Sequence, residues 1–310
     1  MGGAVFRWLH LSDIHVGMTD EDVLWPTFKH ALYDDFSALF SKIGAPDVII
    51  FSGDIAQLGR PEEYDRFTEI LSEIREKLSG YGSPPPLIAV PGNHDLTRPK
   101  AGGLFEAAMR HVPADEAVLR QVFDTGGDYK KMIADAFGNF TAWQDRLIES
   151  GLHLPPANRG PMPGDASFEL AKDGKSVGIV ALNSAWLQLS AGDYLGRLHV
   201  DPRQINGCTE DDPEDWCRAK DVRLVVTHHP VEWLTQSSRG LWNSEIAPAG
   251  RFDLHLYGHM HVHAATATAF GGSQSRRQLQ GSSVFGLEYV DGSKQREHGY
   301  PRAVPGPTSE

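Results

Sequence analysis

The sequence predicts a mixed α/β fold. Over residues 5–90, short apolar runs typical of buried strands alternate with longer segments whose apolar residues recur at helical spacing. The chain has 310 residues and 40% hydrophobic content, which is enough to bury a large core as one α/β domain with insertions. Layered α/β proteins require such an alternation, so helices packed against a sheet are expected.

Residues 5–90 contain the clearest elements. The continuous apolar run at 47–52 is typical of a strand buried on both faces, and Pro61 suits the first position of a helix. Apolar residues at helical spacing predict an amphipathic helix before that run and another after Pro61. Strands are expected at 5–11, 47–52 and 87–90, and helices at 20–41 and 61–78.

The middle of the chain is predicted to be helical and to carry no ligand motif. We interpret residues 100–165 as a helical cap inserted into the domain. Such insertions commonly determine which substrate enters the site. Its helices are expected at 104–111, 115–123 and 129–149, and a loop rich in proline and glycine at 153–164.

The remaining residues predict more strands. Apolar runs at 176–182, 222–227 and 251–257 are expected to join the sheet system, and closing antiparallel strands are expected at 265–270, 277–280 and 283–289. The domain is predicted to span 1–295. Residues 296–310 are polar and rich in proline, which predicts a disordered tail.

Five polar motifs follow apolar runs. They are Asp13-Ile14-His15, Gly53-Asp54, Gly92-Asn93-His94-Asp95, His228-His229-Pro230 and Gly258-His259-Met260-His261. Carboxylate, amide oxygen and neutral imidazole are accepted together by Mn²⁺, Fe²⁺ and Zn²⁺. A carboxylate can bridge two ions, and Asp54 is the natural bridge. Side chains two apart on an extended segment share a face, which suits Asp13 with His15. The motifs therefore predict a two-metal site.

In this order the motifs resemble the calcineurin-like metallophosphoesterase family, over roughly residues 5–290. The resemblance implies a four-layer αββα sandwich of two mixed β-sheets flanked by helices. It also implies that one ion binds Asp13, His15, Asp54 and His261, and that the other binds Asp54, Asn93, His228 and His259. His228, rather than His229, is the implied ligand. The metals are Mn, Fe or Zn, which the ligand types do not distinguish.

The implied reaction is hydrolysis of a phosphodiester by a metal-bridging hydroxide. By the same resemblance, His94 contacts the phosphate and protonates the leaving oxygen, and Asp95 orients His94. Substrate contacts are expected from Asn93, His94, His229 and Trp186, since an aromatic ring beside the metals can stack a nucleobase.

Three functional readings follow. A phosphodiesterase, with cyclic nucleotides as the candidate substrates, is preferred, because the ligand order is similar to the bacterial cyclic-nucleotide phosphodiesterase branch. The first alternative is a metal-dependent nuclease, since residues 6–13 and 279–286 also resemble effector domains of larger bacterial proteins. The alternative from another class is a binding module that keeps the fold without catalysis.

Composition and charge limit the partners and the cellular location that can be expected. A formal charge of −12 and a pI near 5.6 disfavour nucleic acid as a partner without excluding it. Cys208 and Cys217 are not in a metal-spaced pair and are expected to be free thiols. No signal peptide or membrane span is recognisable, so a cytoplasmic protein is expected. The sequence does not indicate the oligomeric state.

Overall fold

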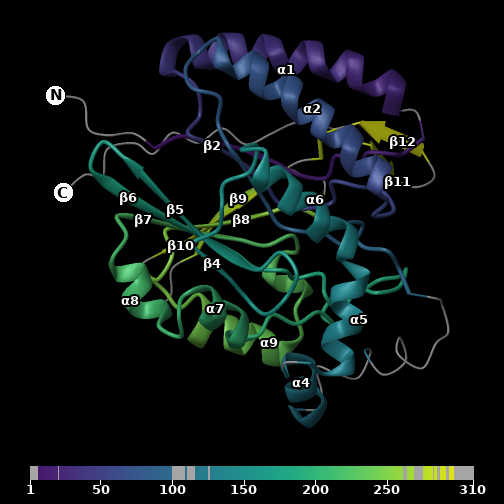
Figure 1. Cartoon of the computed structure of the whole chain (residues 1–310), viewed down its shortest axis with the longest axis vertical. Coiled ribbons are helices and arrows are strands. Elements are labelled where there is room, and N and C mark those ends of the chain that lie inside the picture. The colour runs from purple at the N-terminus through teal and green to yellow at the C-terminus, as the bar shows by residue number, and fades with distance from the viewer. Residues whose placement is uncertain are drawn as a thin grey trace.

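The protein is built from four layers, two β-sheets between two layers of helices (Figure 1). The structure is a computed structural model that describes residues 6–19, 21–99, 109, 116–124, 126–260, 264–268, 275–281, 283–284, 287–290 and 293–296. Three separate hydrophobic clusters lie between successive layers. The predicted αββα sandwich is therefore confirmed.

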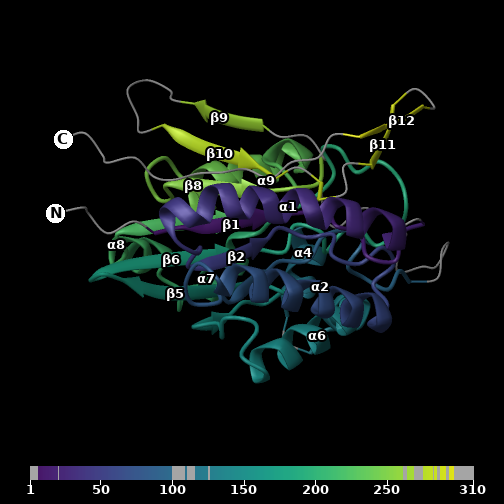
Figure 2. The same cartoon turned by 90° about the horizontal axis from the view of Figure 1, so that it is seen from above.

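The first sheet contains β1 (Trp8–Leu11), β2 (Val48–Phe51) and β3 (Leu87–Ala89), in that order. Both pairings are parallel, so the described part of this sheet is not mixed, unlike the expectation for both sheets. The helices α1 (Glu21–Ile43) and α2 (Pro61–Ser79) cover its outer face, as Figure 2 shows from above. The second helix begins at Pro61, as predicted.

The second sheet has seven strands in the order β4, β5, β6, β7, β8, β10, β9 and is mixed. The central strands β6, β7, β8 and β10 run parallel, whereas the flanking pairs are antiparallel. The strands span Asn158–Arg159, Ala166–Lys172, Lys175–Ala181, Val222–Val226, Leu254–Tyr257, Arg276–Gln280 and Ala264–Thr268 in that order. A separate antiparallel pair joins β11 (Leu287–Val290) to β12 (Ser293–Arg296).

Successive side chains of a strand point to opposite faces of its sheet, which explains how the two sheets stack. Ile50, Val48 and Ile88 of the first sheet face Phe168, Ile179 and other residues of the second, and all of these side chains are buried in one cluster. The outer face of the second sheet carries Val180 and Val225, which pack with α7 (Pro202–Cys208) and the π-helical turn η3 (Trp242–Ile246). This helical layer also contains α8 (Pro213–Arg218) and α9 (Gln236–Leu241), on the opposite side from α1 and α2 in Figure 1.

The helices of the predicted cap do not form one unit, because they pack in two different hydrophobic clusters. The helix α6 (Gly138–Glu149) contributes Phe140 and Trp143 to the cluster beneath α2. In contrast, α4 (Glu116–Phe123) and α5 (Asp128–Ala136) pack in the cluster on the outer side of the second sheet. A role in substrate selection stays a prediction. The helix expected at 104–111 lies outside the described residues except for Met109. The predicted tail at 296–310 also lies outside them except for Arg296, which is the last residue of a strand and not part of a tail.

The sequence interpretation missed β5 and the short helices α7, α8 and α9. The strand β5 pairs with β6 through a two-residue turn at Asp173-Gly174, where both residues have positive φ of 49° and 79°. An Asp-Gly pair is a typical signal for such a hairpin. The burial of β5 alternates only in its second half, which is why its pattern does not stand out.

Candidate metal centre

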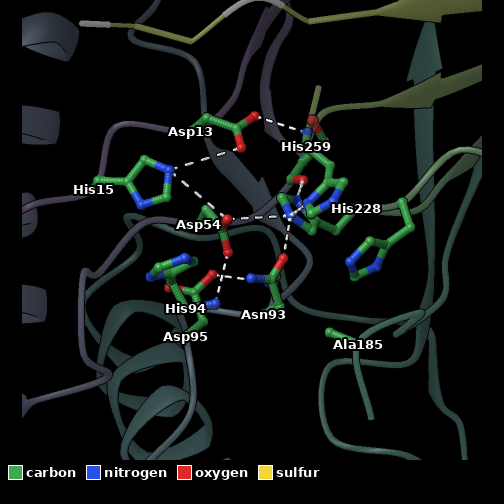
Figure 3. A network of polar contacts seen from close by, with 12 residues as sticks. Asp13, His15, Asp54, Asn93, His94, Asp95, Ala185, His228 and His259 are labelled. Carbon is green, nitrogen blue, oxygen red and sulfur yellow. Dashed lines mark hydrogen bonds and ion pairs between the residues drawn. The ribbon is translucent and has the colours of Figure 1, made fainter. Parts of the chain in front are cut away.

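The candidate ligands come from both sheets and meet at one end of the strands. In each sheet the parallel strands end on the same side, so the residues that follow them gather there. Figure 3 shows Asp13 and His15 from the turn after β1, Asp54 after β2, Asn93 after β3, His228 after β7 and His259 after β8. The two sheets are linked here by the main-chain N–H of His259, which donates to Oδ2 of Asp13 at 3.0 Å.

Asp54 lies at the centre of this cluster. Its Oδ2 is 3.2 Å from Nε2 of His228 and 3.8 Å from Nε2 of His15, while Oδ1 accepts from the main-chain N–H of His94 at 2.8 Å. Burial by itself would raise the pKa of Asp54, but the neighbouring imidazoles, His228 first among them, hold it well below its usual range. An ionised carboxylate that faces two groups of imidazoles suits a bridge between two cations.

His228 is oriented by its backbone partner. Its Nδ1 lies 2.7 Å from the carbonyl oxygen of Ser52, which only accepts, so Nδ1 carries the proton and donates. The Nε2 of His228 is then 3.2 Å from both Oδ1 of Asn93 and Nδ1 of His259. Burial alone would lower the pKa of His228, but the Asp54 carboxylate raises it to about 9. A cation that binds Nε2 must therefore displace a proton.

Four candidate ligands adopt a left-handed backbone conformation that the sequence does not predict. Asp13, His15, Asp54 and His259 have positive φ of 55°, 50°, 55° and 72°. The idea that Asp13 and His15 share the face of an extended strand is therefore wrong, because both lie in left-handed turns beyond β1. Non-glycine residues in this region are costly and cluster at functional sites. We interpret this left-handed conformation as the means by which the backbone directs the four side chains towards the site.

Glycine is required at two motif positions, because the backbone there passes very close to ligand side chains. A Cβ on Gly92 would lie 2.2 Å from Oδ1 of Asp54, and one on Gly258 would lie 2.5 Å from Oδ2 of Asp13. Any larger residue would displace the carboxylate beside it. The glycines that precede the Asn-His-Asp and His-Met-His runs therefore have a steric reason to be glycine.

His94 lies beside this cluster and is held by a partner that the sequence did not indicate. Its ring is edge-on to that of His15 with centroids 4.7 Å apart, and its Nδ1 donates to the carbonyl oxygen of Gln57 at 2.9 Å. This hydrogen bond fixes the ring through Nδ1 and leaves Nε2 out of the contact. The expectation that Asp95 orients His94 is corrected, because the hydrogen-bond partner of the His94 ring is the Gln57 carbonyl.

Asp95 instead joins the two ligand turns. Its carboxylate accepts from the main-chain N–H groups of Ile55 and Ala56, at 3.2 and 2.8 Å, and of Gly92, at 2.9 Å. Burial and the charge of Asp54 raise the pKa of Asp95 to about 6, against the effect of these three donors. Asp95 therefore ties together the turns after β2 and β3.

The aromatic residues near the site do not lie as expected. Trp186 is 0% exposed and packs against Phe123 and His199 in the hydrophobic cluster, so it is not available to a substrate. Trp233 is only partly buried, and its ring is edge-on to that of His259 with centroids 4.0 Å apart. Both tryptophans lie in connections that follow strands of the second sheet, and no local signal in the sequence distinguishes the buried ring from the partly buried one.

The residue types and spacing fit divalent cations. Among the described residues, three groups have ligand atoms within 4.8 Å of one another, namely Asp13 with Asp54 and His228, His15 with Asp54 and His94, and His228 with His229 and His259. Asp54 belongs to two of these groups. Oxygen and nitrogen donors of this kind suit Mn, Fe and Zn and do not choose among them. His261, the remaining implied ligand, lies outside the described residues.

A four-layer sandwich with carboxylate and imidazole groups where its strands end is typical of metal-dependent phosphoric ester hydrolases. The chain belongs to the calcineurin-like phosphoesterase family, whose model matches residues 6–263. Membership implies divalent metals at this site. In the part of the chain that the structure describes, no helix combines the length and apolarity needed to cross a bilayer.

Curated and solved relatives extend the comparison. Glycerophosphodiester phosphodiesterase GpdQ of Enterobacter lignolyticus (strain SCF1) is 42% identical over 139 residues, a match that covers 40% of this chain and 46% of the relative. The chain therefore spans less than half of that relative's length. A putative 5'-nucleotidase from Staphylococcus aureus has a TM-score of 0.44 at 14% identity, covering 90% of this chain and 49% of that one. The purple acid phosphatase PPD1 of yellow lupin (Lupinus luteus) has a TM-score of 0.49 at 12% identity, covering 96% and 49%.

Proposed function

We propose that the chain is a binuclear-metal-dependent phosphoesterase that hydrolyses phosphodiester bonds. The observation that supports this most directly is the position of Asp54, whose carboxylate lies between His15 on one side and His228 on the other. The proposed ligands of the first cation are Asp13, His15, Asp54 and His261, and those of the second are Asp54, Asn93, His228 and His259.

The proposed mechanism uses His94 as the proton donor. When bound, a pair of cations clamps phosphoryl oxygens and lowers the pKa of a shared water. The chain's own contribution is to deliver a proton to the leaving oxygen from Nε2 of the doubly protonated His94 ring, which is left neutral with its other proton on Nδ1, donated to the Gln57 carbonyl. The contact to His15 limits the rotation of the His94 ring. Asn93 is the proposed additional contact to the substrate.

The phosphodiester preference rests on the named activity of a relative and on the motif order. Glycerophosphodiester phosphodiesterase GpdQ matches 40% of this chain at 42% identity, which favours a diester over a monoester. A cyclic nucleotide is the narrower proposal. Because Trp186 is buried, Trp233 replaces it as the candidate ring for stacking a base.

The test is hydrolysis of bis(p-nitrophenyl) phosphate by the full chain with and without Mn²⁺. Manganese-dependent turnover that a chelator abolishes is the expected result. A panel of p-nitrophenyl phosphate, glycerophosphodiesters, cyclic nucleotides and single-stranded DNA would then define the substrate. Turnover of DNA alone would favour the nuclease reading. Tight metal uptake without turnover of any ester would favour the non-catalytic binding module and contradict the proposal.

We also propose a cytoplasmic location. Cys208 and Cys217 are both buried and unpaired, which confirms the free thiols expected from the sequence. Unpaired cysteines are usual in a reducing compartment. Labelling of the protein in fractionated cells would check this location.

A further inference from the structure

A pocket opens at the end of the first sheet opposite the candidate metal centre. Its volume is about 340 Å³, and its walls include residues 44–47 and 81–86. Three of its lining residues, Arg7, Asp47 and Pro86, directly precede the parallel strands β1, β2 and β3. The candidate ligands follow the same strands, so the length of the sheet separates the pocket from the metal centre. The proposed mechanism does not use this pocket.

The walls of the pocket are held in place by contacts behind them. Residues 84–86 are three consecutive prolines, whose rings fix the backbone φ. The carbonyl oxygen of Pro85 accepts from Nε of Arg75 at 2.7 Å, and the hydroxyl of Tyr81 lies 2.8 Å from that of Ser37. A pocket with such walls is formed before any ligand arrives, which reduces the entropic cost of binding.

The charges that line the pocket do not balance. The carboxylate of Asp47 is fully engaged, since Oδ1 lies 2.5 Å from Nζ of Lys172 and Oδ2 accepts from the main-chain N–H of Arg7 at 2.8 Å. Asp47 therefore offsets the charge of Lys172. The guanidinium of Arg7 makes no ion pair within the described part of the chain, and its Nε is buried there without a hydrogen-bond partner.

An unmatched guanidinium in a preformed pocket favours an anion. Burying an N–H without an acceptor is unfavourable, and the local positive charge stands out in a chain whose formal charge is −12. A guanidinium presents its donors as a planar fork that matches the two oxygens of a carboxylate or phosphate. The ring of Tyr81 and the prolines beside it offer an apolar wall. The volume lies near the lower limit of small-molecule pockets, which selects a small ligand.

We propose that this pocket binds a small organic anion, whose carboxylate or phosphate group pairs with Arg7 and whose apolar part packs against Tyr81 and residues 84–86. The site is separate from the metal centre, and the proposal does not depend on the proposed function. Lys172 stays with Asp47 in the bound state, so a single fork holds the anionic group.

The test uses the full chain loaded with Zn²⁺ and four small probes. Benzoate and phenylphosphonate carry a ring and an anionic group, benzamide lacks the charge, and acetate lacks the ring. The ¹⁵N–¹H resonances of Arg7 Nε and of the main-chain N–H of Ser83 are followed, because both residues line the pocket and neither is near the metals. The better of the two ring-bearing anions should shift both resonances saturably, with a Kd about tenfold below those of benzamide and acetate. Which of the two it is distinguishes a carboxylate from a phosphate ligand.

Variants then test the role of the guanidinium. Arg7→Gln should raise the Kd of the better anion at least about tenfold, as measured at Ser83, and Arg7→Lys should fall between it and the wild type because it keeps the charge without the fork. Arg146→Gln is the matched control, since Arg146 already pairs with Asp65 on the surface at 2.8 Å, and it should bind like the wild type. Diester hydrolysis and the urea midpoint should be unchanged in Arg7→Gln.

Three results would overturn the proposal. They are the absence of a saturable shift of Arg7 Nε with either ring-bearing anion, a benzamide affinity equal to that of the anions, and an unchanged Kd in Arg7→Gln. The first two need only the wild type, so they decide the matter even if a variant fails to fold. Wild type that binds the anion at Arg7 but hydrolyses no diester would instead contradict only the proposed function.

Discussion

The main-chain N–H of His94 donates to Oδ1 of Asp54 at 2.8 Å, so the turn after β3 orients the carboxylate at the centre of the site. The other oxygen of Asp54 is thereby directed towards the imidazoles of His228 and His15. Asp95 strengthens the same connection, since its carboxylate accepts main-chain N–H groups from both turns. The candidate bridge is thus held by backbone groups before any cation binds.

Replacing Asp54 with alanine should remove both metals and all measurable turnover, because the two proposed cation sites share this carboxylate. Metal content by elemental analysis and hydrolysis of bis(p-nitrophenyl) phosphate are the measurements. Asp65→Ala is the matched control, since Asp65 makes a surface ion pair with Arg146 at 2.8 Å. A variant without Asp54 that still holds two ions per chain would contradict the bridging role.

His94→Ala should keep both metals and lose turnover by about 10²–10⁴-fold, the usual contribution of a positioned proton donor. The loss should depend on the leaving group. An alkoxide needs the proton far more than p-nitrophenolate does, so alkyl diesters should be affected more than bis(p-nitrophenyl) phosphate. Steady-state rates on both substrates measure this difference. Equal losses would indicate that His94 binds phosphate without donating a proton.

Gly92→Ala should damage the site through Asp54, because the new Cβ would lie 2.2 Å from Oδ1 of that carboxylate. Overpacking of this kind typically costs about 1–3 kcal/mol of stability, and here the displaced carboxylate should also weaken metal binding. Gly138→Ala is the control, since a Cβ there meets no atom within 4 Å. Urea unfolding and metal titration of both variants test the prediction. Normal metal affinity in Gly92→Ala would show that Asp54 moves without consequence.

The position of the site could be predicted because its ligands directly follow strands. Residues at the ends of parallel strands meet at one edge of a sheet, so the motif order was sufficient to expect Asp13, Asp54, Asn93, His228 and His259 together. Their backbone conformation could not be predicted. Asp13 and His15 are separated by one residue, which also fits an extended strand, and only the fold imposes their positive φ values.

The residues around the ligands were harder to predict, because they depend on how loops pack. Trp186 and Trp233 both follow strands or turns near the site, yet one fills the core and the other contacts His259. Gln57 acts through its main-chain carbonyl, which no side-chain pattern reveals. The strand β5 was missed because its clearest sign is the Asp173-Gly174 turn and not its own alternation.

His153 should make stability depend on pH independently of the metals. It is 1% exposed, its Nε2 accepts from the main-chain N–H of Ala89 at 3.1 Å, and its Nδ1 donates to the carbonyl oxygen of Leu154 at 2.7 Å. These contacts require the neutral ring, and burial lowers the pKa of His153 to about 4. The unfolded chain, with a pKa of about 6.5 at this residue, binds the proton first as the pH falls.

Between pH 6.5 and 4 the unfolded state therefore holds more protons at His153 than the folded state does, so acidification destabilises the fold. The contribution of His153 is complete above pH 6.5 and declines by up to about 1.4 kcal/mol per pH unit below it. Urea unfolding in the presence of a chelator, from pH 8 to 4.5, should show a smaller acid loss in His153→Gln than in the wild type. Gln keeps an acceptor for Ala89 without a titrating ring, and other histidines contribute equally to both proteins. Parallel curves for the two proteins would show that His153 does not titrate in this range.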